Sequence, residues 1–303
     1  LITNTTAANH TAVGYYALKA NTSGQQNTAV GASAMVANTT GGNNVAVGYL
    51  AMDANTTASF NTAVGNECMT DNTTGTGNTG VGHRALWKVT EGDNNTAMGI
   101  YALDSCTTGQ RNTGFGYYTG HLISSGEDNV ALGHAALHNN ETGDENVAVG
   151  YAALYDATGA NNIAMGYDAG RANSPGGNIT TASNRIVLGN NNHTSAHIKI
   201  DWTVTSDERD KMNFAEVPHG LSFVNDLKPI KFDFKKSRDD ETPHGTTKYG
   251  FKAQDILALE GDNPIIIDNE NEDSLHITNS HLIPVLVKAI QELSAEIEIL
   301  KAK

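Results

Sequence analysis

A glycine that recurs every seventeen residues is the feature that most constrains how this chain can fold. Nine glycines are spaced 17 residues apart, and a tenth follows after 16. An Asn stands four residues before most of them, an apolar residue stands one before, and an Ala-Leu or Ala-Met pair usually follows three and four residues after. Such a strict period indicates that each repeat adopts the same shape and packs on the next. These repeat glycines are Gly14, Gly31, Gly48, Gly65, Gly82, Gly99, Gly116, Gly133, Gly150 and Gly166.

The length of the repeat suits one coil of a parallel β-solenoid, because 17 residues are too few for a pair of helices. We predict two short strands and two turns per coil, with coils about 4.8 Å apart. The apolar residues just before the glycines, such as Val30 and Met98, are expected to stack inward. The glycine provides a positive φ or a close backbone approach, and the Asn side chains form ladders between coils.

A second apolar stripe consists of the Ala-Leu pairs, such as Ala17-Leu18 and Ala153-Leu154. A single coil has a thin core for its surface, so this second stripe suggests contact with another chain. We therefore predict a mainly β protein in which residues 1–200 form a parallel β-solenoid or β-roll shaft. The expected assembly is a parallel homo-oligomer, most simply a homotrimer.

Cysteine and histidine do not predict a disulfide or a metal site. Cys68 and Cys106 are about two repeats apart, which corresponds to roughly 10 Å between stacked coils and is too far for a disulfide. We predict two free thiols that fill positions of small residues. The histidines of the repeat form no metal-binding spacing and are interpreted as surface residues, and no cofactor is expected.

Tyrosine recurs directly after the repeat glycine. Stacked tyrosines can hold sugars, which need apolar faces and hydroxyl partners together, but the residues favour packing between coils as their role. The paired acids that glycoside hydrolysis requires cannot be singled out, because Glu127-Asp128 and Asp144-Glu145 read as solvated turns. The tyrosines in question are Tyr15, Tyr49, Tyr117, Tyr151 and Tyr167.

The charge and hydropathy patterns argue against two classes of partner. The net charge is −14, and acidic residues outnumber basic ones on both sides of residue 205, so no basic face for nucleic acid is expected. No apolar run approaches the roughly 18–20 residues that cross a bilayer, so membrane insertion is not expected. The sequence starts at Leu1 and shows no signal peptide, which is consistent with a fragment.

After residue 200 the period ends, and residues 201–303 read as a small α+β domain. Helical and alternating patterns predict a short helix at 220–227, a strand at 228–234, a polar loop at 235–247 and a strand leading into a helix at 249–256. Two short apolar segments, 264–267 and 274–277, suggest a hairpin.

The last segment, about 280–301, has the pattern of a helix. Its apolar residues alternate spacings of three and four, with Ile at heptad position a and Leu at d, which is typical of a coiled coil. The alternative is an amphipathic helix that lies on its own domain. The heptad residues are Ile283, Leu286, Ile290, Leu293, Ile297 and Leu300.

Four ordered blocks in residues 203–303 resemble a known family. They are S-D-x-R-x-K-x-N at 206–213, a G-L-x-F-V block at 220–235, G-F-x-A-Q-D at 250–255, and an I-P-x-L-V-K-A-I-Q-E-L helix at 283–293. This order resembles the C-terminal intramolecular chaperone domain of phage tail spikes and tail fibres, the peptidase S74 family. The 17-residue repeat resembles the head repeats of trimeric autotransporter adhesins, which form left-handed β-rolls.

The first resemblance implies a domain that trimerises the chain, sets the register of β-structured folding and then releases itself by autoproteolysis. It implies that Ser206 is the nucleophile and Lys211 its partner in a Ser-Lys dyad. The cut is expected at the Ser206–Asp207 bond, with Thr205–Ser206 as the alternative.

The chemistry of the dyad is consistent with this reading. A serine hydroxyl needs a base, and a lysine can serve when burial or nearby positive charge favours its neutral form. Arg209 could provide such charge, whereas the neighbouring acids Asp207, Glu208 and Asp210 oppose it. We therefore expect assembly to switch on cleavage. Gln254 is a candidate for positioning the backbone near the cut, or simply a core or turn residue.

The sequence thus predicts a segment of a virion tail fibre or spike, assembled in the host cytoplasm and acting outside the cell. The shaft is expected to bind a bacterial surface glycan or protein receptor. The alternatives are a non-enzymatic trimeric surface adhesin and a glycan depolymerase carried by the shaft.

Overall fold

The computed structural model describes residues 3–4, 6–175, 177–197, 199, 206–235, 240–269 and 275–303. The chain divides into two compact units, Leu1–Asn192 and His193–Lys303. The predicted boundary at residues 200 and 201 falls outside the described residues.

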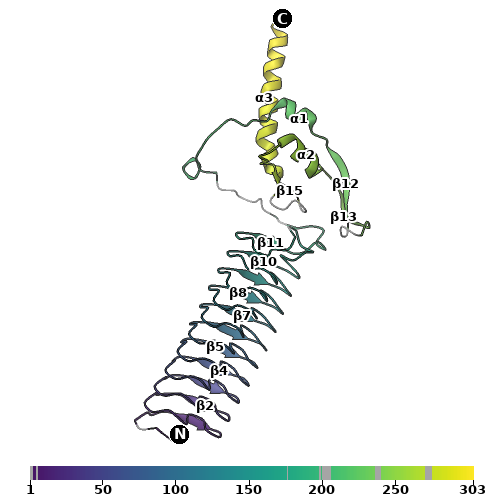
Figure 1. Cartoon of the computed structure of the whole chain (residues 1–303). Helices are drawn as coiled ribbons and strands as arrows, with labels where there is room; N and C mark the ends of the chain where they lie inside the picture. The colour runs from purple at the N-terminus through teal and green to yellow at the C-terminus, as the bar shows by residue number, and fades with distance from the viewer. Residues whose placement is uncertain are drawn as a thin grey trace. The chain divides into compact units, whose positions relative to one another are not determined.

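The first unit is a parallel β-solenoid, as predicted. One three-residue strand per coil joins an eleven-stranded sheet whose order follows the sequence, and the strands lie above one another along one side of the coils (Figure 1). The second strand predicted for each coil is wrong, because the rest of each described coil consists of turns and bends. The strands are β1 Thr11–Val13, β2 Thr28–Val30, β3 Val45–Val47, β4 Thr62–Val64, β5 Thr79–Val81, β6 Thr96–Met98, β7 Thr113–Phe115, β8 Val130–Leu132, β9 Val147–Val149, β10 Ile163–Met165 and β11 Ile186–Leu188.

The register of the sheet repeats the sequence period. Thr11 pairs with Thr28 and Val13 with Val30, and the same offset of 17 continues through β9. Equivalent residues of successive coils therefore lie side by side. The last two strand pairs have other offsets but keep the same alignment: Ile163 of β10 pairs with Val147 of β9 and with Ile186 of β11.

The core of the solenoid reverses the predicted roles of the two apolar stripes. The Ala-Leu pairs after the repeat glycines, including Leu18 and Met52, are fully buried inside their own chain. The central residue of the strands, which is an alanine in most of them, also faces inward, as Ala46 does. The residue before the glycine therefore points outward, because side chains alternate along a strand: Val13 is 58% exposed and Met98 49% exposed. The predicted inward stacking of these residues is wrong, and the stripe assigned to another chain is the core.

The predicted roles of glycine and asparagine are confirmed. Gly48 has a φ of +146°, and a Cβ there would lie 2.1 Å from the carbonyl oxygen of Gly65, so a side chain does not fit. Buried asparagines form a ladder in which the backbone N–H of Asn44 donates to Oδ1 of Asn27 at 3.0 Å and its Nδ2 donates to the carbonyl of Ala58 at 2.9 Å. The ladder satisfies backbone groups that water cannot reach.

Both cysteines are free and buried, as predicted. Cys68 occupies the position of the core alanine, and burial raises the pKa of its thiol to about 12. None of the helices in the described residues combines the length and apolar character that crossing a membrane requires.

The second unit contains the predicted α+β elements. The regular elements are α1 Leu221–Asp226, β12 Ile230–Lys235, β13 Pro243–Gly250, α2 Ala253–Glu260, β14 Ile267–Asp268, β15 His276–Ile277 and α3 Leu282–Lys301. Two 3-10 helices are present: η1 (Glu208–Asp210) precedes the regular elements, and η2 (Asn279–His281) lies directly before α3. The strand β13 begins inside the predicted polar loop, because its polar residues pair with β12 in an exposed antiparallel ribbon and give no alternating signal.

Helix α3 buries one face on its own unit and leaves another open. Leu282 and Val285 pack with Phe223 of α1 and with the β14 region. Figure 1 shows the C-terminal part of α3, in yellow, extending beyond α1 and α2. The six heptad residues lie on the open face and are 42–68% exposed. The amphipathic alternative describes the face that packs on the unit, and the coiled coil on the exposed face stays a prediction.

Two carboxylates tie the second unit together through backbone groups. Glu292 of α3 accepts a hydrogen bond from the N–H of Leu221 at 2.7 Å, at the start of α1. Glu260 accepts three hydrogen bonds, from the N–H groups of Ile265, Ile266 and Ile267, at 2.7–3.0 Å. A charged acceptor makes stronger hydrogen bonds than a neutral one, so each contact fixes a loop against a helix.

Candidate active site

A single tight turn positions the predicted dyad. Asp207 caps the 3-10 helix η1 by accepting a hydrogen bond from the N–H of Arg209 at 2.9 Å. The helix ends at Asp210, and the N–H of Lys211 donates to the carbonyl of Glu208 at 3.1 Å. The turn brings residues 206 and 211 together although five positions separate them in sequence.

Ser206 and Lys211 are in direct contact. The Nζ of Lys211 donates to the Oγ of Ser206 at 2.6 Å and lies 3.3 Å from the carbonyl oxygen of Ser206. That carbonyl belongs to the Ser206–Asp207 peptide bond. The amine is therefore within reach of both the hydroxyl that would lose a proton and a carbonyl that could be attacked. Both side chains are exposed in the single chain.

Arg209 binds Asp207 rather than the dyad. Its Nη2 donates to Oδ2 of Asp207 at 2.5 Å and its Nε to Oδ1 at 3.0 Å. This guanidinium lowers the pKa of the Asp207 carboxyl below its ordinary value. The pairing holds a negative charge next to the dyad in a salt bridge. Sequence reasoning named Arg209 but missed this partner, because the η1 turn that brings the two side chains together is not fixed by their spacing.

The remaining candidates are not brought to the dyad. Gln254 is the second residue of α2 and is exposed, and within the described part of the chain it forms no hydrogen bond with Ser206 or Lys211. Its proposed role near the cut stays a prediction. Thr205, which belongs to the alternative cleavage bond, lies outside the described residues. Among the described residues, no group of three or more His, Cys, Asp or Glu is placed to hold a metal ion.

Comparison with known proteins places this turn at the start of a family match. Residues 206–262 match the family model of peptidase S74, described as the chaperone of endosialidase. A search of curated proteins and a search of solved structures gave no match. The match starts at Ser206 and runs through α1, β12, β13 and α2. Together with the β-solenoid, it shows that the chain fits a tail fibre or tail spike with a C-terminal chaperone domain of the peptidase S74 family.

Proposed function

We propose that this chain is a segment of a phage tail fibre or spike that assembles as a homotrimer and then cuts itself at the Ser206–Asp207 bond. The observation that carries the proposal is the 2.6 Å contact between Lys211 Nζ and Ser206 Oγ at the first residue of the family match. The coarser role, a chaperone domain on a β-solenoid, follows from the family match and the fold.

The proposed cleavage begins when neutral Lys211 accepts the hydroxyl proton of Ser206. The serine oxygen attacks a carbonyl carbon, the C–N bond breaks, and the proton held by Lys211 passes to the leaving amide nitrogen. The result is an ester and a new amino terminus. Water then hydrolyses the ester, restores the Ser206 hydroxyl and leaves a new carboxylate.

Ring size separates the two candidate bonds. The Ser206 oxygen reaches the carbonyl carbon of residue 205 in the same chain through a five-membered ring, which favours the alternative Thr205–Ser206 bond. Attack on its own carbonyl carbon would close a strained four-membered ring. A cut at Ser206–Asp207 therefore requires that the serine of a neighbouring chain attack this carbonyl. This requirement would couple cleavage to assembly.

Exposure of the dyad supports the same coupling. A lysine base works best when it is removed from water, whereas Lys211 and Ser206 are both exposed in the single chain. In this proposal, neighbouring chains bury the pair once the trimer has formed. The single chain therefore stays intact until it is assembled.

Two exposed apolar surfaces are available for assembly. One is the open face of α3, which carries the six heptad residues. The other is the strand stripe, the outward residues before the repeat glycines, including Met98 and Met165. Ile at heptad position a with Leu at d also suits a two-stranded coiled coil. We therefore infer three copies from the family match and from the proposed role as a tail fibre, and not from the heptad pattern. Light scattering on the Ser206→Ala chain would reveal three copies, and Ile290→Glu is expected to lower the mass to one.

The shaft is proposed to attach the virion to a bacterial surface glycan or protein, outside the cell, after assembly in the host cytoplasm. An exposed aromatic face of the solenoid supports this role. The two rivals are a non-enzymatic adhesin, in which no cut would occur, and a glycan depolymerase, in which the purified shaft would release sugars.

Intact mass spectrometry of the expressed chain tests the cleavage directly. Fragments of 206 and 97 residues place the cut at Ser206–Asp207, and fragments of 205 and 98 place it one bond earlier. Ser206→Ala and Lys211→Ala are expected to stay whole, whereas the exposed controls Ser222→Ala and Lys252→Ala are expected to cut. An uncut parent chain within a folded trimer would overturn the peptidase role and leave a permanent trimerisation domain.

A further inference from the structure

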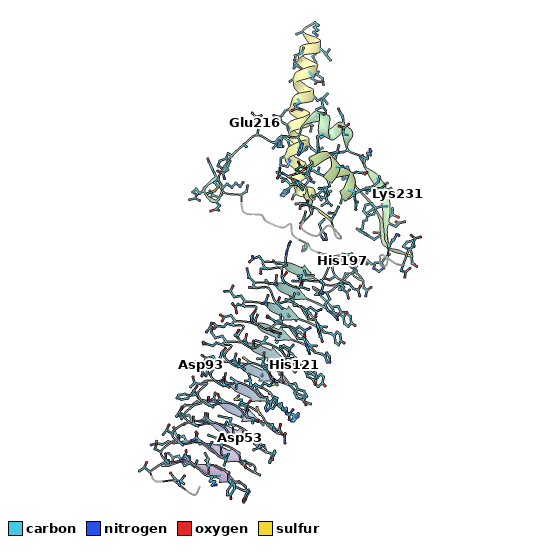
Figure 2. The ribbon with its side chains drawn as sticks, viewed as in Figure 1. Asp53, Asp93, His121, His197, Glu216 and Lys231 are labelled. Atoms are coloured by element: carbon cyan, nitrogen blue, oxygen red, sulfur yellow. The ribbon has the colours of Figure 1, made fainter. Side chains whose placement is uncertain are left out.

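Tyrosine is concentrated on one face of the solenoid. Nine of the ten tyrosines stand one, two or five residues after a repeat glycine, and the tenth lies in the second unit. Other coils have Ser33, Asn66 or Ala135 at the same positions and keep the same fold, so the coil does not need rings there. Figure 2 labels His121 on this side of the coils and Asp93 on the opposite edge.

The rings form columns that run from coil to coil. At the position after the glycine, His134 stacks on Tyr151 with ring centroids 5.0 Å apart, and Tyr151 stacks on Tyr167 at 5.0 Å. Five residues after the glycine, His138 stacks on Tyr155 at 4.6 Å. Sequence reasoning found part of the first column and missed the second, although the same 17-residue period would have revealed it.

Lateral contacts join the columns into one surface, here called the aromatic patch. Tyr118 meets Tyr117 edge-on at 4.4 Å and His121 edge-on at 4.7 Å, and it stacks on Tyr101 at 4.9 Å. The patch thus continues from the coil of Gly99 to the coil of Gly166. Four coil steps at about 4.8 Å give it a length of about 20 Å.

The positive charge on the patch is held by acidic partners. Arg171 binds Asp168 at 2.9 Å and lies over the ring of Tyr155, and His121 contacts the buried Asp104 at 2.5 Å. Burial lowers the pKa of His138, which favours its neutral form. The patch therefore offers hydroxyls, ring nitrogens and ring edges, and it has no excess of positive charge.

The patch is neither the core nor the strand stripe. Tyr117, Tyr151 and Tyr167 are 44%, 46% and 57% exposed, so their rings are open to solvent along one side. The strand stripe is a separate row of aliphatic, methionine and phenylalanine side chains and is the better surface for contact between chains. Trimer formation through that stripe would leave the aromatic patch free.

We infer that the aromatic patch binds an uncharged, extended polysaccharide. Sugars combine apolar C–H surfaces with hydroxyl groups, and tyrosine and neutral histidine present an apolar ring together with a polar tip. A ligand built from repeating units also suits a surface whose donors repeat at every coil. The lack of excess positive charge disfavours an acidic polysaccharide. This inference rests on the proposed attachment function of the shaft and assigns it a place and a ligand class.

The test uses the full chain on an array that carries uncharged bacterial exopolysaccharides and O-chains beside acidic capsular polysaccharides. The parent is expected to bind at least one uncharged member. Tyr151→Ala and Tyr118→Ala are expected to weaken that binding about tenfold, as truncation of a central aromatic contact commonly does. Tyr49→Ala is the matched control, because Tyr49 is equally exposed after its glycine but lies outside the patch.

Folding and assembly are checked on the same samples by circular dichroism and light scattering. If an alanine variant fails to fold, Tyr151→Phe and Tyr118→Phe carry the test, since they keep the ring and remove only the hydroxyl. These variants are expected to bind less tightly than the parent.

Four outcomes would overturn the inference. They are no binding to any uncharged polysaccharide, binding to acidic members alone, an equal loss in Tyr49→Ala, and a change in the mass of the assembly in the patch variants. Intact mass is recorded in parallel. A chain that cuts itself but binds nothing would remove the inference and leave the peptidase proposal, whereas an uncut chain that binds would do the reverse.

Discussion

The two units of this chain reach stability in different ways. In the solenoid, the side chain that fills the core of one coil is repeated 17 residues later, and the hydrogen bonds that join coils are equally regular. In the second unit, contacts join residues far apart in sequence, such as Leu221 and Glu292, and a long apolar face of α3 stays open. The solenoid is thus stabilised by the same contact repeated from coil to coil, whereas the second unit is stabilised by contacts that each occur once.

The largest expected effect is on the rate of cleavage, and the variant that tests it should leave folding unchanged. Lys211→Ala removes the base of the proposed dyad, which contributes about 10²–10⁴-fold to a proton-transfer step. Cleavage is therefore expected to slow by about that factor, as followed by intact mass over time. The melting temperature of the shaft is expected to stay the same. A variant that cuts at the parent rate would exclude Lys211 from the reaction.

Mixed trimers test whether Ser206 attacks within its own chain or in a neighbouring chain. Ser206→Ala chains carrying a mass tag are co-expressed with parent chains. If the serine of a neighbouring chain attacks the Ser206–Asp207 bond, the tagged chains are cut as well, because they still have that peptide bond. Tagged chains that stay whole beside cut parent chains would place the attack within one chain and favour the bond after Thr205.

Met52→Ala tests how much the core of the solenoid contributes to stability. Met52 is fully buried, and truncation of such a side chain costs about 2–5 kcal/mol of unfolding free energy. Val45→Ala, on the outward side of β3, is expected to cost less than about 1 kcal/mol in the single chain. Denaturant titration of the two variants measures the difference. Equal losses would contradict the inward position of Met52.

Asn78→Ala and Glu260→Ala compare how the two units satisfy their backbone groups. Asn78 accepts from the N–H of Asn95 at 2.8 Å and donates to the carbonyl of Gly92 at 2.7 Å, and Glu260 accepts from three N–H groups. Each loss leaves groups without partners and is expected to cost about 1–3 kcal/mol. Hydrogen exchange should localise the effects to the neighbouring coils and to residues 265–267 respectively. The exposed Thr40→Ala serves as a control.

The smallest effect concerns pH and a carboxyl in the solenoid. Burial raises the pKa of Asp53 from its ordinary value of 3.8 to about 6. The folded chain then holds the proton more tightly than the unfolded chain, so stability falls as pH rises from about 4 to about 6. Asp53→Asn should remove this fall and raise stability at pH 7 by about 1 kcal/mol, after allowance for solvent screening. Thermal melts at pH 4 and pH 7 measure it. A steeper fall in the variant would contradict the assignment.

The sequence could predict the repeat, the glycine corners and the asparagine ladder, because each depends on contacts between identical positions. It could not decide which apolar stripe faces inward. Val30 and Leu18 are both apolar, and only the closure of the coil, with room for one large side chain per turn, selects Leu18. The pairing of Ser206 with Lys211 was predicted from family resemblance. The pairing of Arg209 with Asp207 needed the local backbone, which spacing alone does not fix.

The uniform register of the sheet has a consequence for how such shafts can diversify. Because Val47 meets Val64 as Val30 meets Val47, deletion of one complete repeat, for example residues 45–61, would join coils that already fit each other. The shaft would shorten by about 4.8 Å, and the hydrogen bonds that the deleted coil made would be formed instead by the equivalent residues of the coils on either side. Recombination between repeats could therefore tune the reach of the fibre in fixed increments, while the aromatic patch moves along it unchanged.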